Sequence, residues 1–158
     1  MFGELNQQEI EDVIRYQVIG RIGCHADGLT YVVPISYAYD GEYIYGHTKD
    51  GMKIQMMRKN PEVCFEVDTF QNMANWQSII AWGQFEELTH DPERHIGLTK
   101  LHERILPLIP SATTKLSPDW PFTPKNIDAI KGIVYRVRLG KKTGRYENNS
   151  VPSFLGWG

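Results

Sequence analysis

The chain has 158 residues, with 17 Lys and Arg against 19 Asp and Glu, and a formal net charge of −2 at pH 7. This balance lacks the basic excess of a nucleic-acid-binding domain, and no apolar run approaches the roughly 20 residues that cross a bilayer. The N-terminal segment is acidic where a signal peptide would be basic and then apolar. We expect one cytoplasmic domain, residues 1–158, without nucleic-acid or membrane partners.

Cysteine and histidine give no sign of a metal centre. Cys24 and Cys64 are too few for a disulfide framework or a zinc site, and we expect buried, reduced thiols. Four histidines share no metal-ligand spacing: His25, His90, His95 and His102. The last two are expected to face solvent from a helix. No serine stands in a G-x-S-x-G context, which argues against a serine hydrolase.

The first third of the chain predicts one helix followed by strands. Residues 6–15 (NQQEIEDVIR) place apolar side chains on one helical face, and Asn6 can cap that helix. The apolar period then changes to two, and the turn sequences ADG and DG separate the alternating runs. The expected strands of this region are 16–24, 29–39 and 42–47. In the second of these strands, alternation puts the odd-numbered side chains on one face.

The remaining pattern predicts two more helices and three more strands. A short helix after Gly51 must stop at Pro61, and Gly83 interrupts a long alternating run as a bulge would. Asp91 and Pro92 suit the cap and first residue of the next helix. The expected elements are strand 62–68, strand 76–88, helix 91–106 and strand 132–139. Five prolines with little periodicity indicate a loop or lid over 107–131, with Trp120 and Phe122 as its aromatic residues.

About six strands, mostly joined by hairpin signals, accompany a few peripheral helices. An open sheet of this size would expose two long edges, so a closed antiparallel sheet is favoured. The pattern therefore predicts a mainly β protein built on a small antiparallel β-barrel.

The stretch from His47 to Pro61 (HTKDGMKIQMMRKNP) allows two interpretations. In the first, Thr48 or Asp50 caps a helix on which Met52 and Met56 share a face. In the second, the unpaired amides of the helix N-terminus form an anion cradle for a phosphate monoester. The Thr48 hydroxyl, a His47 ring nitrogen and the charge of Lys53 would complete that cradle.

The run from the DG hairpin through H-T-x-x-G-x-K to N-P-x-V-C-F-E-V-D, followed by WQSIIAWGQFEEL, resembles the FMN-binding split-barrel proteins related to pyridoxamine 5′-phosphate oxidase. Within them it is most similar to the short branch of nitroimidazole-resistance proteins. The resemblance covers residues 18–106. It implies a split β-barrel that forms a homodimer, with FMN bound in a groove between the subunits.

The same resemblance implies roles for particular residues. His47, Thr48 and Lys53 would hold the FMN phosphate. One strand segment would run beside the isoalloxazine, and it consists of Val32, Val33, Pro34 and Ile35. A proline donates no backbone hydrogen bond, so Pro34 fits a sheet edge. Ser78 corresponds to a flavin-contacting position of the larger oxidases, and Trp76 would pack at the subunit interface.

Departures from the oxidases bear on the substrate. The strand beside the expected flavin (YVVPIS) has no Lys or Arg, so the phosphate of pyridoxamine phosphate would meet no compensating charge. We expect a flavin-dependent oxidoreductase that takes electrons from NADH or NADPH and passes them to a small neutral acceptor, such as a nitroaromatic (nitroimidazole) or a quinone. No catalytic side chain is assigned, because the flavin carries the chemistry.

Three other functions stay open. The first is a haem-binding or haem-degrading split barrel, in which His25 or His102 would bind the iron. The second is an enzyme similar to pyridoxamine 5′-phosphate oxidase, and the third is a flavin-storage or sensing module without turnover.

Overall fold

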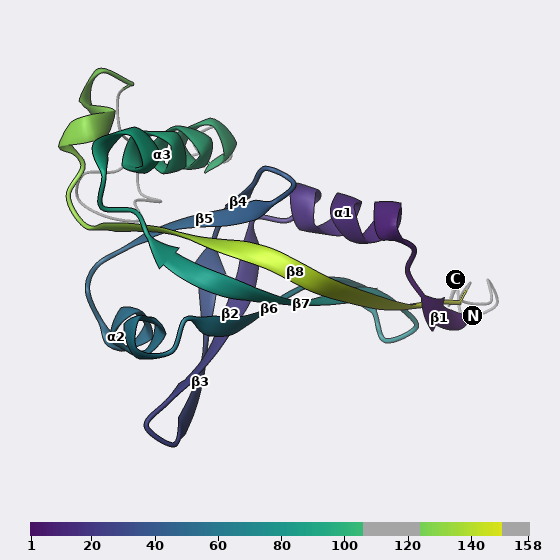
Figure 1. Ribbon diagram of the computed structural model, residues 1–158. Coiled ribbons are helices and arrows are strands. Elements are labelled where there is room, and N and C mark those ends of the chain that lie inside the picture. The colour runs from purple at the N-terminus through teal and green to yellow at the C-terminus, as the bar shows by residue number, and fades with distance from the viewer. Residues whose placement is uncertain (106–123, 150–158) are drawn as a thin grey trace, which may run out of the picture.

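The computed structural model describes residues 1–105 and 124–149 (Figure 1). Its described elements are β1 (Phe2–Glu4), α1 (Gln7–Tyr16), β2 (Ile19–Ala26), β3 (Leu29–Ser36), β4 (Ala38–Tyr39), β5 (Tyr43–Thr48), α2 (Met52–Lys59), β6 (Glu62–Asn72), β7 (Asn75–Glu87), α3 (Asp91–Ile105), the 3-10 helix η2 (Pro124–Ala129) and β8 (Ile133–Asn148). The prediction of a mainly β fold with few helices is confirmed, with eight strands in place of about six.

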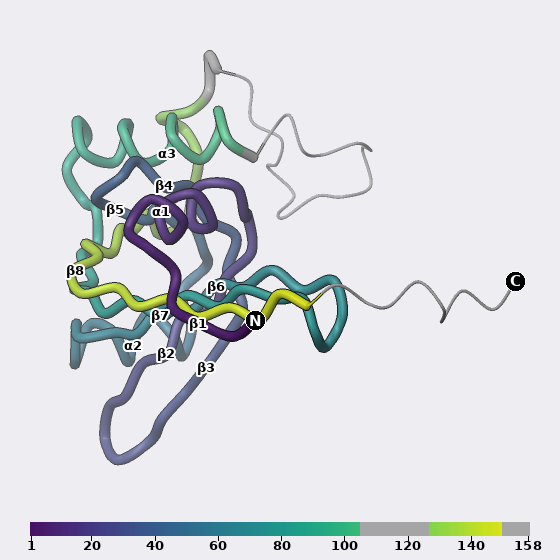
Figure 2. The backbone as a smooth tube through the Cα atoms, turned by 90° about the vertical axis from the view of Figure 1, so that its right-hand side faces the viewer, coloured from purple at the N-terminus to yellow at the C-terminus, as the bar shows by residue number. Residues whose placement is uncertain are grey.

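All eight strands belong to one antiparallel sheet. Their order is β3-β2-β6-β7-β8-β5-β4, and β1 pairs with the far end of β8. The two ends of this order, β3 and β4, follow each other directly in the chain. The sheet therefore curves round a buried core instead of lying open, as the two views show (Figures 1 and 2). This is the split-barrel arrangement.

The three α-helices lie outside the sheet at different places (Figure 1). α1 begins with a capping box between Asn6 and Glu9 and buries three side chains against the core: Ile10, Val13 and Ile14. α2 packs on β2, and α3 packs on β4, β5 and β8. None of the helices that the structure describes is long and apolar enough to span a membrane.

A compact ionic contact joins α1 to the sheet. Lys142 Nζ lies 2.5 Å from Glu11 Oε1, and the Tyr39 hydroxyl donates to Glu11 Oε2 at 2.6 Å. Burial alone would raise the pKa of Glu11, but hydrogen bonds from Lys142 and Tyr39 outweigh it and hold that pKa below its ordinary value. The lysine side chain is only 10% exposed, so this pair is shielded from solvent.

Two predicted strand boundaries near the N-terminus are wrong. Residue 16 belongs to α1, because the Gln17 N–H still donates to Val13 O, and β2 begins only at Ile19. The predicted strand 29–39 breaks at Tyr37. Tyr37 and Ala38 are both buried, so the inward and outward positions exchange at this break, and the hydroxyl of Tyr37 donates to Ile14 O at 2.6 Å. Leu29, at the hairpin end of β3, is 52% exposed.

The C-terminal strand is longer than predicted. β8 runs to Asn148, beyond the expected end at 139, and pairs along its length with β5, β7 and β1. The predicted bulge at Gly83 is confirmed by a register shift between Ala81 and Gly83. Most of the predicted loop 107–131, including Trp120 and Phe122, lies outside the described residues, whereas 124–129 form η2.

Candidate functional site

β5 and α2 bring three predicted ligands together. β5 ends at Thr48, and α2 begins at Met52 after the extended N-cap residue Gly51. No side chain caps this helix: the Thr48 hydroxyl donates to Lys49 O at 3.1 Å, and Asp50 pairs with Arg58 at 3.5 Å. The capping interpretation is therefore wrong. The first-turn amides carry the positive end of the helix dipole, and the turn itself contains no acidic residue.

The methionines of α2 also differ from expectation. Met52 is 52% exposed, whereas Met56 is 6% exposed and packs in the core with Ile54 and Met57. The buried face of α2 therefore does not include its first residue, Met52. Met52 is thus exposed, whereas Ile54 in the same turn anchors the helix in the core.

Lys53 is half-buried in that first turn. Its Nζ lies 5.8 Å from the centre of the Tyr135 ring, and no carboxylate within 1–105 or 124–149 forms an ion pair with it. Burial lowers the pKa of Lys53. The thiol of Cys24 interacts with the same ammonium and contacts Tyr31 O at 3.7 Å, which places the lysine beside the β2–β3 hairpin. An anion here would meet a charge that no side chain of this region neutralises.

The His47 ring is held by the turn before β8. Its Nε2 donates to Lys131 O at 2.7 Å, so this nitrogen is not the one that would donate to a phosphate. Gly132 follows in the left-handed region, with φ of +105°, and a Cβ there would lie 2.8 Å from Nε2. The ring is thus fixed by the backbone.

β3 is an edge strand, as Pro34 indicated. Among the strands that the structure describes it pairs with β2 alone, and Pro34 stands opposite Arg21. Val32 is 62% exposed and Ile35 is 6% exposed, with Val33 between these extremes. The segment Val32–Ile35 therefore presents an unpaired backbone edge that a planar ligand could contact.

Ser78 and Trp76 do not lie near the other predicted ligands within one chain. Ser78 stands opposite Arg145, and the Trp76 Nε1–H donates to Glu147 at 3.1 Å, both at the C-terminal end of β8. Thr48 stands opposite Ile133 at the other end of β8. At ~3.3 Å per residue, these two ends of the strand are roughly 40 Å apart.

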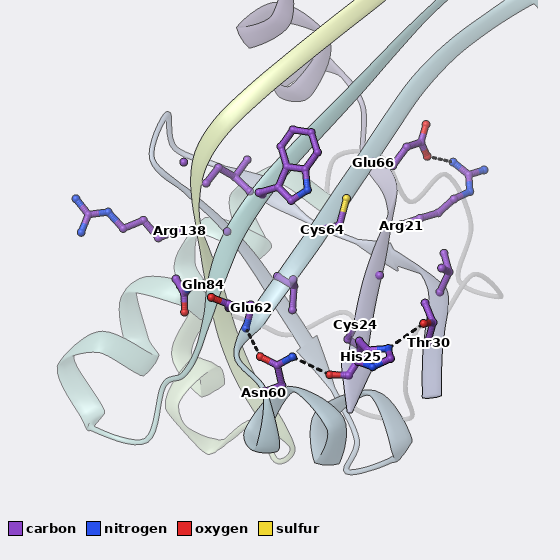
Figure 3. A pocket seen from close by; sticks show the side chains of 17 residues that line it. Arg21, Cys24, His25, Thr30, Asn60, Glu62, Cys64, Glu66, Gln84 and Arg138 are labelled. Atoms are coloured by element: carbon purple, nitrogen blue, oxygen red, sulfur yellow. Dashed lines mark hydrogen bonds and ion pairs between the residues drawn. The ribbon is translucent and has the colours of Figure 1, made fainter. Parts of the chain in front are cut away.

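A groove of about 960 Å³ crosses the outward face of β2, β3, β6, β7 and β8 (Figure 3). Gly23 and Cys64 line this groove, together with the exposed side chains of Val32 and Trp82. Arg21 pairs with Glu66 at 3.1 Å on one side of it. Sequence reasoning did not single out this face, although the alternation of β2 and β7 contains it.

The histidines considered for haem lie in different surroundings. His25 is exposed and hydrogen-bonded to the Thr30 hydroxyl at 2.9 Å. His102 is partly buried, and its Nδ1 finds no hydrogen-bond partner among the described residues; the burial corrects the expectation of a solvent-facing side chain. His95 pairs with Asp128 at 2.8 Å. Over 1–105 and 124–149, no cluster of three His, Cys, Asp or Glu side chains could hold a metal ion.

Residues 6–146 match the sequence model of the family described as pyridoxamine 5′-phosphate oxidase, and the chain belongs to that family. An uncharacterized protein of Rhizobium meliloti is 28% identical over 148 residues, which cover 89% of this chain and 92% of the relative.

Solved structures share the fold at lower identity. A FAD-binding protein from Mesorhizobium loti superposes with a TM-score of 0.74 at 24% identity, over 94% of this chain and 99% of that one. A proposed 5-nitroimidazole antibiotic resistance protein from Bacteroides thetaiotaomicron superposes with a TM-score of 0.68 at 19% identity, over 92% of this chain and 87% of that one. The haem storage protein HutZ from Vibrio cholerae superposes with a TM-score of 0.66 at 10% identity, over 90% of this chain and 96% of that one.

Proposed function

We propose that this chain binds FMN and serves as a flavin-dependent oxidoreductase. The observation that carries the proposal is the first turn of α2, where a half-buried Lys53 without a carboxylate partner in the described chain adjoins a helix N-terminus without a side-chain cap. Charge and amide donors meet there, and the Thr48 hydroxyl would join them by turning away from Lys49 O; together they suit a phosphate monoester. His47 stands next to this hydroxyl at the end of β5.

The relatives support a flavin, since one solved structure of this fold is a FAD-binding protein. One lysine and one helix N-terminus suit the single phosphate of FMN better than a diphosphate. The open edge of β3 gives the isoalloxazine ring a place to meet backbone groups, with Val32 exposed beside it. When bound, the flavin would supply the redox chemistry between NADH or NADPH and the acceptor.

The acceptor is proposed to be small and neutral, such as a nitroaromatic or a quinone. β3 carries no cation, and the nearby arginines already have partners: Arg21 pairs with Glu66, and Arg138 pairs with Glu42 at 3.3 Å. An anionic substrate would therefore gain little compensation from this chain. The likeness to a proposed nitroimidazole-resistance protein points to the same class of acceptor.

A homodimer completes the proposed site. Val32, Ile80 and Trp82 are exposed apolar side chains on the outward face of the sheet, and a second copy packed there would cover them. It could also carry its own Ser78 and Trp76 to the flavin, which the separation along β8 prevents within one chain. The cofactor would then contact both subunits.

Haem is the second candidate, because HutZ has this fold and the buried Nδ1 of His102 has no hydrogen-bond partner within residues 1–105 and 124–149. The absorption spectrum of the purified protein separates the two proposals. Flavin gives two broad bands in the blue and near ultraviolet, and haem gives a Soret band. Chromatography of the released cofactor then distinguishes FMN from FAD. A colourless protein that takes up neither FMN nor haem on titration would refute both.

A further inference from the structure

Three consecutive carbonyl groups form the turn that leads into β8. They belong to Ile130, Lys131 and Gly132, and the middle one accepts the hydrogen bond from His47 Nε2 at 2.7 Å. Gly132 lies so close that an added Cβ would be 2.8 Å from His47 Nε2 and 3.0 Å from Thr48 O. Any displacement of this turn would therefore move the end of β5, where the phosphate ligands stand.

Arg94, on α3, holds the carbonyl groups on both sides of that middle one. Its Nη1 donates to Gly132 O at 3.1 Å, and its Nη2 donates to Ile130 O. A guanidinium presents its N–H groups in a rigid plane, so two bonds of this kind fix the direction of the peptide between them. No carboxylate of the described chain pairs with Arg94, so its donors serve the backbone of this turn.

We propose that Arg94 is a positioning residue for the anion cradle. It acts through the 130–132 turn, orienting the Lys131 carbonyl and hence the tautomer and ring direction of His47. A donor fixed at Nε2 decides which edge of the imidazole meets the cradle. The expected effect of Arg94 on FMN affinity rests on the proposed function. Its effect on the orientation of His47 does not, because that orientation is a property of the chain without cofactor.

The simpler alternative is that Arg94 only anchors α3 to the barrel. The same helix contains a matched control: Arg104 also donates to two backbone carbonyls, Arg15 O at 3.3 Å and Tyr16 O at 2.8 Å. It joins α3 to the end of α1 and has no contact with the cradle. An anchoring role predicts similar behaviour for variants at the two arginines, whereas a positioning role does not.

The experiment compares Arg94→Met and Arg104→Met, each in the native chain and together with His47→Ala. Kd values are measured for FMN and for riboflavin, which has the same ring without the phosphate. We expect Arg94→Met to weaken FMN binding about three- to tenfold, which is the range of one hydrogen bond, and to leave the affinity for riboflavin unchanged. Arg104→Met should change neither affinity, and the effect of Arg94→Met should vanish when His47 is absent. Equal losses for both flavins, or equal effects of the two arginines, would overturn the inference.

A second readout uses the protein without cofactor. In ¹⁵N NMR spectra, His47 should carry its proton on Nε2 in the native chain and exchange between tautomers in Arg94→Met, with Arg94→Lys restoring part of the native signal. Unchanged His47 signals in Arg94→Met would refute the positioning role even where flavin binds. If the native chain shows the expected His47 signals but binds no flavin, the proposed function fails, and with it the link between Arg94 and affinity.

Discussion

The ammonium group of Lys53 lies 5.8 Å from the centre of the Tyr135 ring. That ring is 1% exposed, and it packs so tightly on the backbone of Gly46 that no side chain would fit there. The tyrosine is therefore a rigid surface under the lysine, and the electron-rich ring face offsets part of the cost of burying the charge. A bound anion would supply the rest.

Replacing Lys53 with Ala should weaken FMN binding roughly ten- to a hundredfold, because a hydrogen bond to a charged group contributes about 1.5–3 kcal/mol. Riboflavin affinity and the circular dichroism of the apoprotein should not change. Lys59→Ala is the matched control, since Lys59 belongs to the last turn of the same helix and pairs with Asp27. Fluorescence titration measures both variants. FMN affinity equal to that of the native chain would exclude Lys53 from the cradle.

Gly51→Asp should change stability and cofactor binding in opposite directions. Gly51 has an extended backbone with φ of −175°, and a Cβ there would meet nothing within 4 Å, so the substitution causes no strain. An aspartate cap adds a few tenths of a kcal/mol to the free energy of unfolding, and its charge favours the helix dipole. The same carboxylate should repel a phosphate. Urea denaturation and FMN titration check the two effects.

Gly51→Asn separates the two causes in that experiment, because it can cap the helix without adding charge. It should stabilise the apoprotein and reduce FMN affinity less than Gly51→Asp does. If the aspartate variant binds FMN as tightly as the native chain, the N-terminus of α2 does not hold the phosphate.

Trp82→Glu should produce a monomer with a native circular dichroism spectrum and weaker flavin binding. Trp82 is 44% exposed beside the groove on the outward face, and a charge there would be costly to bury under a second copy. Ile96→Glu is the control, because Ile96 is 48% exposed but lies on α3. Light scattering gives the oligomeric state. A native chain that is monomeric with its full complement of flavin would contradict the shared site.

Glu11→Gln should destabilise the protein by about 1–3 kcal/mol at neutral pH, because it breaks a shielded, charge-assisted contact with Lys142 and Tyr39. The pKa of Glu11 in the folded chain lies below its ordinary value of 4.5, so the native contact stabilises above that pH. Its contribution is lost as the pH falls through the folded-state pKa. The difference in the free energy of unfolding between the variant and the native chain, measured by urea denaturation, should therefore shrink in acid. An undiminished difference would mean that the charge of Glu11 is unimportant. Asp12→Asn, one residue away, serves as the control.

Steady-state assays should show electron transfer to a nitroaromatic or quinone and poor oxidation of pyridoxamine 5′-phosphate. The reason is electrostatic: β3 has no cation, and Arg145, the C-terminal arginine nearest in sequence to the chain end, already lies 3.6 Å from Glu4. Efficient formation of pyridoxal phosphate would reverse the proposed choice of substrate.

The sequence predicted the elements well where local signals agree. The cap at Asn6, the hairpin at 40–41 and the bulge at Gly83 each depend on a few neighbouring residues, and all three are present. The end of β8 was missed because residues 140–148 are mostly polar and basic. They form a strand through pairing with β7 and β1, which no local pattern reveals.

The sequence was enough to predict candidate residues for binding the phosphate, but not the residues that hold them in place. His47, Thr48 and Lys53 are close in sequence, so one strand, turn and helix place them. Arg94 and Gly132 reach the same place from distant parts of the chain, and only the fold brings them to His47. That neither Thr48 nor Asp50 caps α2 could also be seen only in the structure, because the N-cap position falls on Gly51, which follows both residues.

β8 is the last of the described strands to be translated, yet it pairs with β1, β5 and β7. Until Ile133 and the residues after it leave the ribosome, those three strands lack a neighbour, and their exposed edges could associate with other chains. The described sheet can therefore close only after residues 133–148 have been synthesised. A nascent chain arrested before β8 should be protease-sensitive and should recruit chaperones, whereas one extended past Asn148 should become resistant.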